Sequence, residues 1–392
     1  MALNIGGKKV ETPPAKPLKV SSELAALIAA SAKHYGDDKL FLKGNDIPDV
    51  LRLPTGVYEV DVGLNGGFPR GRYSIIVGPE GVGKSIMMYL ALAQAQRYPP
   101  PCNKAVLIDL EDTYDPKWGA VLGIDNDLLT VIKPSYGEQA MDMIEAVAQA
   151  DDVLCLGIDS ISLALSTAEI DQSSEKFNVG NEAKMVTRMV NKLILAMSKE
   201  KKRDHTPCVI FINQIRYKIG VMFGNPETQN GGKAFLFNSS LTLRIGGNEK
   251  IDKATNLALL KATKIEVKKA KVPINHKVIE YDMCVVAHDK LKPGQTDSWG
   301  LLSASLKASG HLENLGPGKG WKLLKKTYPT LVPIKEQYEE NDAFRNQLQQ
   351  LVASTFHGKG IAVSAEGVAA PSSSYTVLPD GTKVDPDTGE VL

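Results

Sequence analysis

Residues 78–86 have the types and spacing needed to hold a phosphate chain. They read Gly-Pro-Glu-Gly-Val-Gly-Lys-Ser-Ile, which fits a glycine, four free positions and then Gly-Lys-Ser. The glycines let backbone N–H groups turn toward a phosphate without obstruction by Cβ, and a following helix adds its positive end. The lysine can reach the β- and γ-phosphates, and the serine can bind Mg²⁺. The candidate nucleotide-binding residues are therefore Gly78, Pro79, Glu80, Gly81, Val82, Gly83, Lys84, Ser85 and Ile86. A glycine-rich turn that binds nothing is the alternative.

Carboxylates at two predicted strand ends could complete this site. The apolar run 153–159 ends in Asp159, and a carboxylate in that place holds Mg²⁺ together with the loop serine Ser85. Alone, an aspartate at a strand end is equally typical of a helix cap. A second run, 105–109, leads into Glu111, which is placed to act as general base on an attacking water. Glu111 is the first choice for the base and Asp109 is the alternative.

The residues after Glu111 include candidates for contact with an adenine base. Asp115 can accept a hydrogen bond from the N6 amino group of adenine, and Trp118 can stack on the ring. Packing of Trp118 in the core is an open alternative.

A third polar strand end precedes a segment of unusual composition. The run 208–213 is apolar and ends in Asn213, and the amide of Gln214 after it can sense a γ-phosphate. Residues 215–232 are apolar, basic and rich in glycine at once. Such a mixture suits a loop that places backbone amides on phosphates and aliphatic side chains between the bases of a single strand.

The elements that position these residues alternate along the chain. Helical stretches are expected at 84–97, 138–149 and 181–200. Strands are expected at 73–77, 105–109, 130–133, 153–159, 208–213, 240–245, 256–261 and 278–286. Because strands alternate with helices early and follow one another closely later, we expect an α/β fold with a largely parallel sheet and an antiparallel extension.

Changes in composition divide the chain into parts. A helix capped by Ser21 or Ser22 and running through Lys33 is expected, followed by a short strand at 40–42, and both need a surface on which to dock. In the C-terminal part, helices are expected near 300–309 and 335–354. The predicted parts are an N-terminal arm with an oligomerisation helix and strand (1–48), a core (49–288), a small domain (296–360) and a flexible tail (369–392).

Composition points to a soluble protein. Charged residues make up 23% and apolar residues 43% of the chain, and neither a membrane span nor a signal peptide is expected. The four cysteines form no CxxC pair and the six histidines no metal-ligand spacing, which favours buried thiols and a cytoplasmic location.

The net charge of +1 excludes a uniformly basic surface. However, eight lysines between Lys250 and Lys277 face only two acidic residues, either as a solvated face or as the lining of a nucleotide or polyanion site.

At this point the sequence closely resembles the bacterial RecA recombinase family. The runs Phe211–Arg216 and Lys218–Thr228 are similar, nearly residue for residue, to the family's second DNA-binding loop. Asp109-x-Glu111, Asp115-Pro116, Gly137-Glu-Gln139 and Asp159-Ser160 match in order, and the resemblance covers about 20–285 and, more weakly, 296–360. It implies a RecA-type P-loop NTPase core, a small N-terminal helix–strand element and a small α-rich C-terminal domain.

The resemblance implies an ATP- and Mg²⁺-dependent recombinase. Such a protein polymerises on single-stranded DNA as a helical filament, pairs it with homologous double-stranded DNA and hydrolyses ATP to ADP and phosphate. Glu111 would be the base, Gln214 the γ-phosphate sensor, Glu80 part of the coupling loop and Phe237 a subunit contact. Lys269 and Lys271 would reach the ATP of the adjacent subunit. The DNA loops would lie at 171–180 and 215–232, and the DNA-binding residues would be Val179, Gly180, Lys184, Thr187, Asn191, Arg216, Ile219, Gly231 and Gly232.

Several positions depart from the family pattern. Trp118 replaces a tyrosine, Lys184 and Asn191 replace arginines, and Leu236 replaces a lysine. Because lysine and asparagine lack the bidentate fork of arginine, DNA contacts there are expected to be weaker. The stretch after Lys271 is one residue short, which leaves the choice among Lys268, Lys269 and Lys271 open. These departures suggest a divergent or phage-encoded member.

Two other classes of function share the same nucleotide site. A RecA-core motor, such as a helicase or a branch-migration ATPase, is the first, and the composition of 215–230 argues against it. A nucleotide-gated scaffold without catalysis is the second, and the presence of Glu111 and Gln214 argues against that class.

Overall fold

The computed structural model describes most of the chain, in two compact units, Met1–Asp49 and Val50–Leu392. The described residues are 22–35, 45, 47, 49–161, 179–199, 206–217, 227–229, 232–253, 255–288, 290–356, 376–377 and 383–384. The first unit contains α1 (Ser22–Tyr35), in agreement with the expected helix. The strand expected at 40–42 lies outside the described residues.

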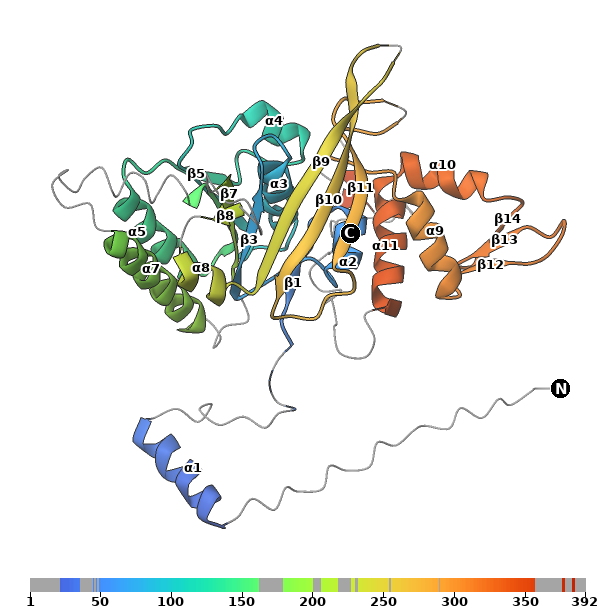
Figure 1. Ribbon diagram of the computed structural model, residues 1–392. Helices are drawn as coiled ribbons and strands as arrows, with labels where there is room; N and C mark the ends of the chain where they lie inside the picture. The colour runs from blue at the N-terminus through green and yellow to red at the C-terminus, as the bar shows by residue number, and fades with distance from the viewer. Residues whose placement is uncertain are drawn as a thin grey trace. The chain divides into compact units, whose positions relative to one another are not determined.

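A nine-stranded sheet forms the centre of the second unit (Figure 1). Its strand order is β11-β10-β9-β3-β7-β6-β4-β5, with β8 beside β7. The pairs from β9 to β5 are parallel, and β9, β10 and β11 pair antiparallel, which confirms the expected mixed sheet. The strands are β3 (Arg72–Gly78), β4 (Lys104–Asp109), β5 (Leu129–Ile132), β6 (Val153–Asp159), β7 (Cys208–Tyr217), β8 (Glu227–Gln229), β9 (Leu241–Ile251), β10 (Ala258–Ala270) and β11 (Val278–Cys284).

Helices cover both faces of this sheet. On one face α3 (Lys84–Gln96) packs in a cluster with β3, β9 and the antiparallel strands. On the other face lie α5 (Gly137–Ala148), α7 (Val179–Lys199) and α8 (Gly232–Asn238), drawn in colours from blue-green to yellow in Figure 1. In α7 the buried side chains recur at helical spacing, as an amphipathic helix requires; they are Val186, Met189, Val190, Leu193, Ala196 and Met197. The second unit also contains α2 (Tyr58–Gly63), α4 (Pro116–Val121) and the strand pair β1 (Arg52–Leu53) and β2 (Phe68–Pro69).

The strands that lead to the candidate site are buried on both faces, which is why their sequences are continuous apolar runs. All seven residues of β6 and six of the seven residues of β3 are buried. By contrast, β9 and β10 extend well beyond the expected strands, to Ile251 and Ala270. Many of their side chains are exposed or half-buried, so polar residues interrupt the apolar pattern from which a strand is predicted.

The register of the parallel strands brings their carboxyl ends to one edge, where ligands of open α/β sheets bind. Gly78 at the end of β3 pairs with Gln214 in β7. Asp109 at the end of β4 pairs with Asp159 at the end of β6. The fold therefore gathers the start of the phosphate loop and the three predicted polar strand ends on one side of the sheet.

The C-terminal part has a cluster of its own, in which Tyr58 of α2 also packs. Its helices are α9 (Trp299–Ala308), α10 (Val332–Glu340) and α11 (Asp342–Phe356), and β12 (Leu312–Asn314), β13 (Trp321–Leu323) and β14 (Lys326–Tyr328) form a small sheet. The single helix expected at 335–354 is wrong. Asn341 has an extended backbone, and its Oδ1 accepts a hydrogen bond from Phe344 N at 3.0 Å, so it ends one helix and caps the next.

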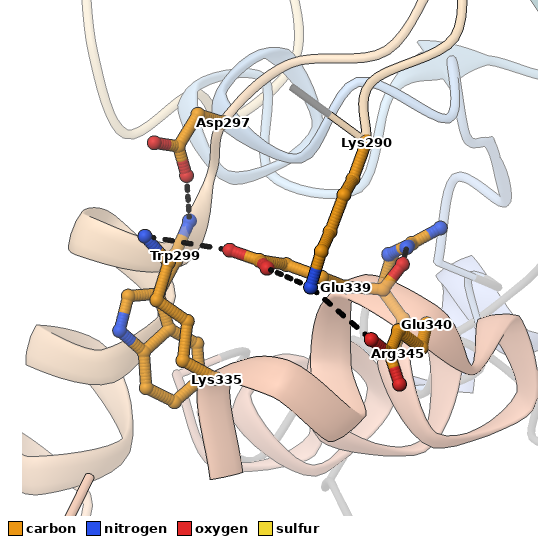
Figure 2. Close-up of polar contacts among 7 residues, drawn as sticks. All are labelled: Lys290, Asp297, Trp299, Lys335, Glu339, Glu340 and Arg345. Carbon is orange, nitrogen blue, oxygen red and sulfur yellow. Dashed lines mark hydrogen bonds and ion pairs between the residues drawn. The ribbon is translucent and has the colours of Figure 1, made fainter. Parts of the chain in front are cut away.

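Polar contacts connect the segment before α9 to α10 (Figure 2). Lys290 Nζ lies 3.1 Å from Glu340 Oε1 and 3.5 Å from Glu339 Oε2. Lys335 also pairs with Glu339, at 3.3 Å. Arg345 Nη2 donates to the backbone oxygen of Glu339 at 2.7 Å. Half of the Lys290 side chain is exposed to solvent, so its ion pairs are screened and each contributes little.

The apolar cluster and these ion pairs are expected to contribute unequally to stability. Leu348 is fully buried in the C-terminal cluster, and Leu348→Ala is expected to lower the free energy of unfolding by about 2–5 kcal/mol. Lys290→Ala is expected to change it by about 1 kcal/mol or less. Urea denaturation of the three proteins measures both values, and a larger loss in Lys290→Ala than in Leu348→Ala would contradict this ranking.

Two further observations concern the expected parts of the chain. In the predicted tail, β15 (Thr376–Val377) pairs with β16 (Lys383–Val384), although no structure was expected there. Among the described helices, none combines the length and apolar character that a membrane crossing requires. The predicted domain boundaries stay a prediction.

Candidate nucleotide-binding site

The loop between β3 and α3 has the backbone that the glycine spacing predicts. Gly81 and Gly83 have φ angles of +70° and +99°, which side chains with a Cβ rarely adopt. Gly83 is also the N-cap of α3, so the unpaired N–H groups of the first helical turn face the loop. At Gly78, a Cβ would clash with the backbone oxygen of Ile245 in β9. The loop is therefore shaped to receive an anion at a helix N-terminus.

Gly78 is constrained by a close contact with β9, whereas Gly81 is constrained by its positive φ angle, so substitutions by alanine should have different effects on ATP binding and stability. Gly78→Ala forces β3 and β9 apart and is expected to weaken ATP binding at least about 10-fold, because the loop starts from this strand. Gly81→Ala has free space for its Cβ but retains an unfavourable φ, which costs about 1–2 kcal/mol. Titration with a fluorescent ATP analogue, together with thermal unfolding, tests both. Equal ATP affinity in Gly78→Ala and the wild-type protein would contradict the expectation.

Ser85 and Asp159 lie together as a candidate Mg²⁺ site. Ser85 Oγ donates to Asp159 Oδ2 at 2.7 Å. Burial, together with the charges of Glu111 and Asp109, raises the pKa of Asp159 to about 6, while the Ser85 hydrogen bond and the charge of Lys84 oppose the rise. A hydroxyl and one carboxylate suit Mg²⁺, which usually takes few protein ligands and keeps waters or substrate phosphates in its other positions. The described residues contain no cluster of three or more His, Cys, Asp or Glu side chains for a metal held by protein alone.

Lys84 points back into the loop. Its Nζ donates to Pro79 O at 2.6 Å, and the residue is only 9% exposed. Burial lowers the pKa of Lys84, and nearby Lys261 acts in the same direction, while Asp159, Glu111 and Glu80 oppose the shift. A phosphate chain in the loop would supply the negative charge that a buried ammonium lacks.

Glu111 is held at the same edge by two side chains from neighbouring strand ends. Ser160 Oγ, after β6, donates to Glu111 Oε1 at 2.5 Å. Gln214 Nε2, in β7, donates to the same oxygen at 3.1 Å. The structure thus joins the predicted base to the predicted phosphate sensor. The part played by Ser160 was not foreseen from the sequence, although the family match included Asp159-Ser160.

The carboxylate of Asp109, the alternative base, accepts hydrogen bonds from backbone groups instead of side chains. It accepts from Thr113 N at 3.3 Å and from Tyr114 N at 3.0 Å, and Asp109 is 2% exposed. Asp109 therefore shapes the turn after β4, whereas Glu111 reaches across the sheet edge to Ser160 and Gln214. This geometry favours Glu111 as the base.

The candidate adenine contacts lie at the start of α4. Asp115 is its N-cap and accepts from Lys117 N at 2.8 Å. Trp118 is partly buried and packs against the core cluster that contains α3. Part of the Trp118 side chain therefore packs in the core, as the alternative interpretation expected. The contacts of Asp115 and Trp118 with adenine stay predictions.

Lysines from the antiparallel strands also lie near functional elements. Lys269 Nζ donates to the backbone oxygens of Leu236 (2.7 Å) and Phe237 at the end of α8. Its ammonium and that of Lys271 lie 5.4 Å and 5.1 Å from the centre of the Phe237 ring, which is 73% exposed. A third lysine, Lys261, donates to the backbone oxygen of Gly81. Its contact was not foreseen, and the excess of lysines was its only sequence signal.

The predicted DNA-binding residues are described only in part. Val179, Gly180, Lys184, Thr187 and Asn191 belong to α7, so the first predicted loop overlaps the start of a helix; Thr187 is half-buried and Asn191 exposed. Arg216 lies in β7 and Gly232 begins α8, while Ile219 and Gly231 lie outside the described residues. The two loops therefore begin or end on elements that the structure describes.

A phosphate loop after a parallel strand, with carboxylates at the neighbouring strand ends, is the arrangement of a P-loop nucleoside triphosphatase. Comparison with known proteins narrows this class. The sequence model of the RecA N-terminal domain matches residues 22–287, and the chain belongs to the RecA family.

Curated relatives agree with this assignment. Protein RecA of Oceanobacillus iheyensis is 37% identical over 253 residues, which are 64% of this chain and 70% of the relative. Protein RecA of Bacteroides thetaiotaomicron is 36% identical over 66% of this chain and 77% of the relative. Protein RecA of Chlorobaculum parvum is 31% identical over 358 residues, 90% of this chain and 97% of the relative.

Membership confirms the expectations on fold and activity. The chain is an α/β RecA-type protein, a DNA-dependent ATPase and a recombinase that uses ATP and Mg²⁺. Its partners are single-stranded DNA, double-stranded DNA and further copies of itself in a filament. The comparisons do not favour the motor that was considered as an alternative.

Proposed function

We propose that a triphosphate bound by the loop at 78–85 determines the shape of the DNA loop at 215–232, and that Gln214 connects the two. The observation that carries this proposal is the register of β3 and β7, in which Gly78 and Gln214 are paired neighbours. The Gln214 amide donates to Glu111 at 3.1 Å. It could donate to a γ-phosphate instead, and this exchange of partners would move the chain that follows β7.

In the proposed hydrolysis, Lys84 and the backbone N–H groups of the loop hold the phosphates, and Glu111 accepts a proton from the attacking water. Ser160 keeps the Glu111 carboxylate oriented through its hydrogen bond of 2.5 Å. Ser85 and Asp159 would hold Mg²⁺, which neutralises charge on the phosphates when it is bound. Hydrolysis then removes the γ-phosphate from Gln214 and releases the DNA loop.

The proposed DNA contacts follow the backbone of the strand and read no bases. Base pairing between the bound strand and a duplex would supply the sequence specificity. The residues proposed to line the path are Val179, Gly180, Lys184, Thr187, Asn191, Arg216, Ile219, Gly231 and Gly232. With one lysine and one arginine among them, part of the phosphate contact must come from backbone amides and from other subunits.

A neighbouring subunit would complete the ATP site. Lys269, at the end of β10, and Lys271, just after it, place their ammonium groups at the exposed Phe237 ring of α8, so apolar and basic groups lie together there. We assign the lysines to the ATP of the adjacent subunit and Phe237 to the subunit contact. A heterologous contact of this kind generates an open helical assembly.

The function is tested by strand exchange between a circular single strand and a linear duplex. Exchange is expected only with ATP or a slowly hydrolysed analogue, and only with a homologous duplex; a heterologous duplex is the control. Electron microscopy of the same mixtures is expected to show helical filaments. Closed rings together with ATP-dependent unwinding of the duplex would indicate a motor and would overturn the proposal.

Gln214→Ala is expected to separate ATP binding from DNA binding. Gln214 is exposed within β7, and its amide donates to Glu111, so we expect the substitution to leave the core unchanged. We expect the ATP affinity to change less than about 3-fold, while the gain in DNA affinity on adding ATP falls about 10-fold or more. Fluorescence anisotropy of a labelled single strand measures this gain.

Gln139→Ala is the matched control, because Gln139 Oε1 accepts from Ser135 N at 2.8 Å at the start of α5, and Gln139 has no proposed role in the site. An unchanged nucleotide response in Gln214→Ala would exclude this residue as the connection.

A further inference from the structure

The lysines between 250 and 277 differ in what they contact, although the sequence presents them as one group. Several form ion pairs with carboxylates; these are Lys250 with Asp282 at 2.6 Å, Lys264 with Glu280 at 3.3 Å, and Lys268 with Glu266. Lys261 instead donates a hydrogen bond to the backbone oxygen of Gly81. It therefore brings a positive charge to the phosphate loop itself.

Lys261 contacts the phosphate loop although an acidic residue lies opposite it on the neighbouring strand. In the register of β9 and β10, Lys261 lies directly opposite Glu249. Directly opposed residues on antiparallel strands are close enough for opposite charges to pair. The structure nevertheless forms no ion pair between these two described residues, and the lysine reaches the loop instead.

Lys261 and Lys84 place two ammonium groups at one short loop, since Lys84 donates to Pro79 O and Lys261 to Gly81 O. Lys261 is near enough to act on the charge of Lys84. Both lysines donate to backbone oxygens, which carry no full negative charge. Two like charges converging on a loop with inward N–H groups form a site that an anion with several negative charges would stabilise.

We propose that Lys261 is a further nucleotide-binding residue, which holds a phosphate oxygen of the ATP bound to the same subunit. An ammonium group has three donors, so it can contact a phosphate oxygen without rearrangement of β10. This assignment rests on the proposed function of the loop. It differs from that of Lys269 and Lys271, which are proposed to act on the ATP of an adjacent subunit.

The inference is tested by equilibrium binding of ATP and of adenosine without DNA, by displacement of a fluorescent nucleotide at low and high salt. Lys261→Ala and Lys261→Gln are expected to weaken ATP binding about 10-fold at low salt, as loss of a charge-assisted hydrogen bond predicts. The loss is expected to shrink at high salt, and adenosine should bind equally to all proteins. Lys261→Arg should retain ATP affinity within about 3-fold, because the charge remains.

Lys264→Ala is the matched control, since Lys264 lies on the same strand and pairs with Glu280. It is expected to bind ATP as the wild-type protein does. An ATP affinity of Lys261→Ala within about 2-fold of wild type would overturn the inference. Full ATP affinity in Lys261→Gln combined with a loss in Lys261→Ala would also overturn it, because glutamine can donate to Gly81 but carries no charge.

The outcome for the wild-type protein separates this inference from the function on which it depends. A wild-type protein that fails to bind ATP refutes the proposed function of the loop. A wild-type protein that binds ATP, with Lys261→Ala equal to it, refutes only the role of Lys261.

Discussion

Replacement of Lys84 by alanine is expected to weaken ATP binding about 10²- to 10³-fold and to abolish strand exchange at ordinary ATP concentrations. Lys84 is buried in the loop and donates to Pro79 O at 2.6 Å, so its removal takes away the central cation of the phosphate site. The fold should survive, because burial lowers the pKa of this lysine, so the folded state disfavours its charged form and gains no stability from the charge. Nucleotide titration and strand exchange measure the two losses, and thermal unfolding checks the fold.

Lys104→Ala is the control for Lys84→Ala. Lys104 is half-buried at the start of β4, at the opposite end of the same sheet, and has no proposed role in the site. It should bind ATP and exchange strands as the wild-type protein does. Normal strand exchange by folded Lys84→Ala would contradict the requirement for ATP.

Replacement of Glu111 by glutamine is expected to lower kcat for ATP about 10²- to 10⁴-fold, because the general base is lost. The glutamine oxygen can still accept from Ser160 and Gln214, so the geometry of the edge should remain. Binding of ATP and of DNA is expected to persist, and pairing with a homologous duplex should proceed. Release of DNA should slow, because release follows hydrolysis. Phosphate release and dissociation of a labelled strand measure these effects.

Asp109→Asn distinguishes the two candidate bases. The Asp109 carboxylate accepts from two backbone N–H groups, so this substitution is expected to lower stability by about 1–3 kcal/mol and kcat less than Glu111→Gln does. A folded Asp109→Asn protein with the larger loss of kcat would instead identify Asp109 as the base.

The features that the sequence predicted correctly depend on local patterns. The glycine spacing at 78–85 fixes both the loop and the start of α3 at Lys84, because positive φ angles and the helix N-terminus are local properties. The buried strands β3 and β6 are continuous apolar runs, and their polar ends follow directly. A parallel sheet then brings these ends together without further information.

The features that the sequence did not predict depend on contacts between distant residues. Lys261 is 180 residues from Gly81 in the sequence, and nothing in the sequence distinguishes it from the other seven lysines between 250 and 277. Ser160 reaches Glu111 across 49 residues. The break at Asn341 is local, but an asparagine is tolerated within helices as well as at caps, so the apolar spacing around it predicted one continuous helix.

The affinity for single-stranded DNA, measured as a function of salt with and without a non-hydrolysable ATP analogue, tests the coupling most directly. With the analogue we expect binding at least about 10-fold tighter, and a steeper fall of affinity with salt as more phosphates are contacted. Equal affinity and equal salt dependence in both conditions, in a protein shown to bind the analogue, would mean that the nucleotide does not control the DNA loop.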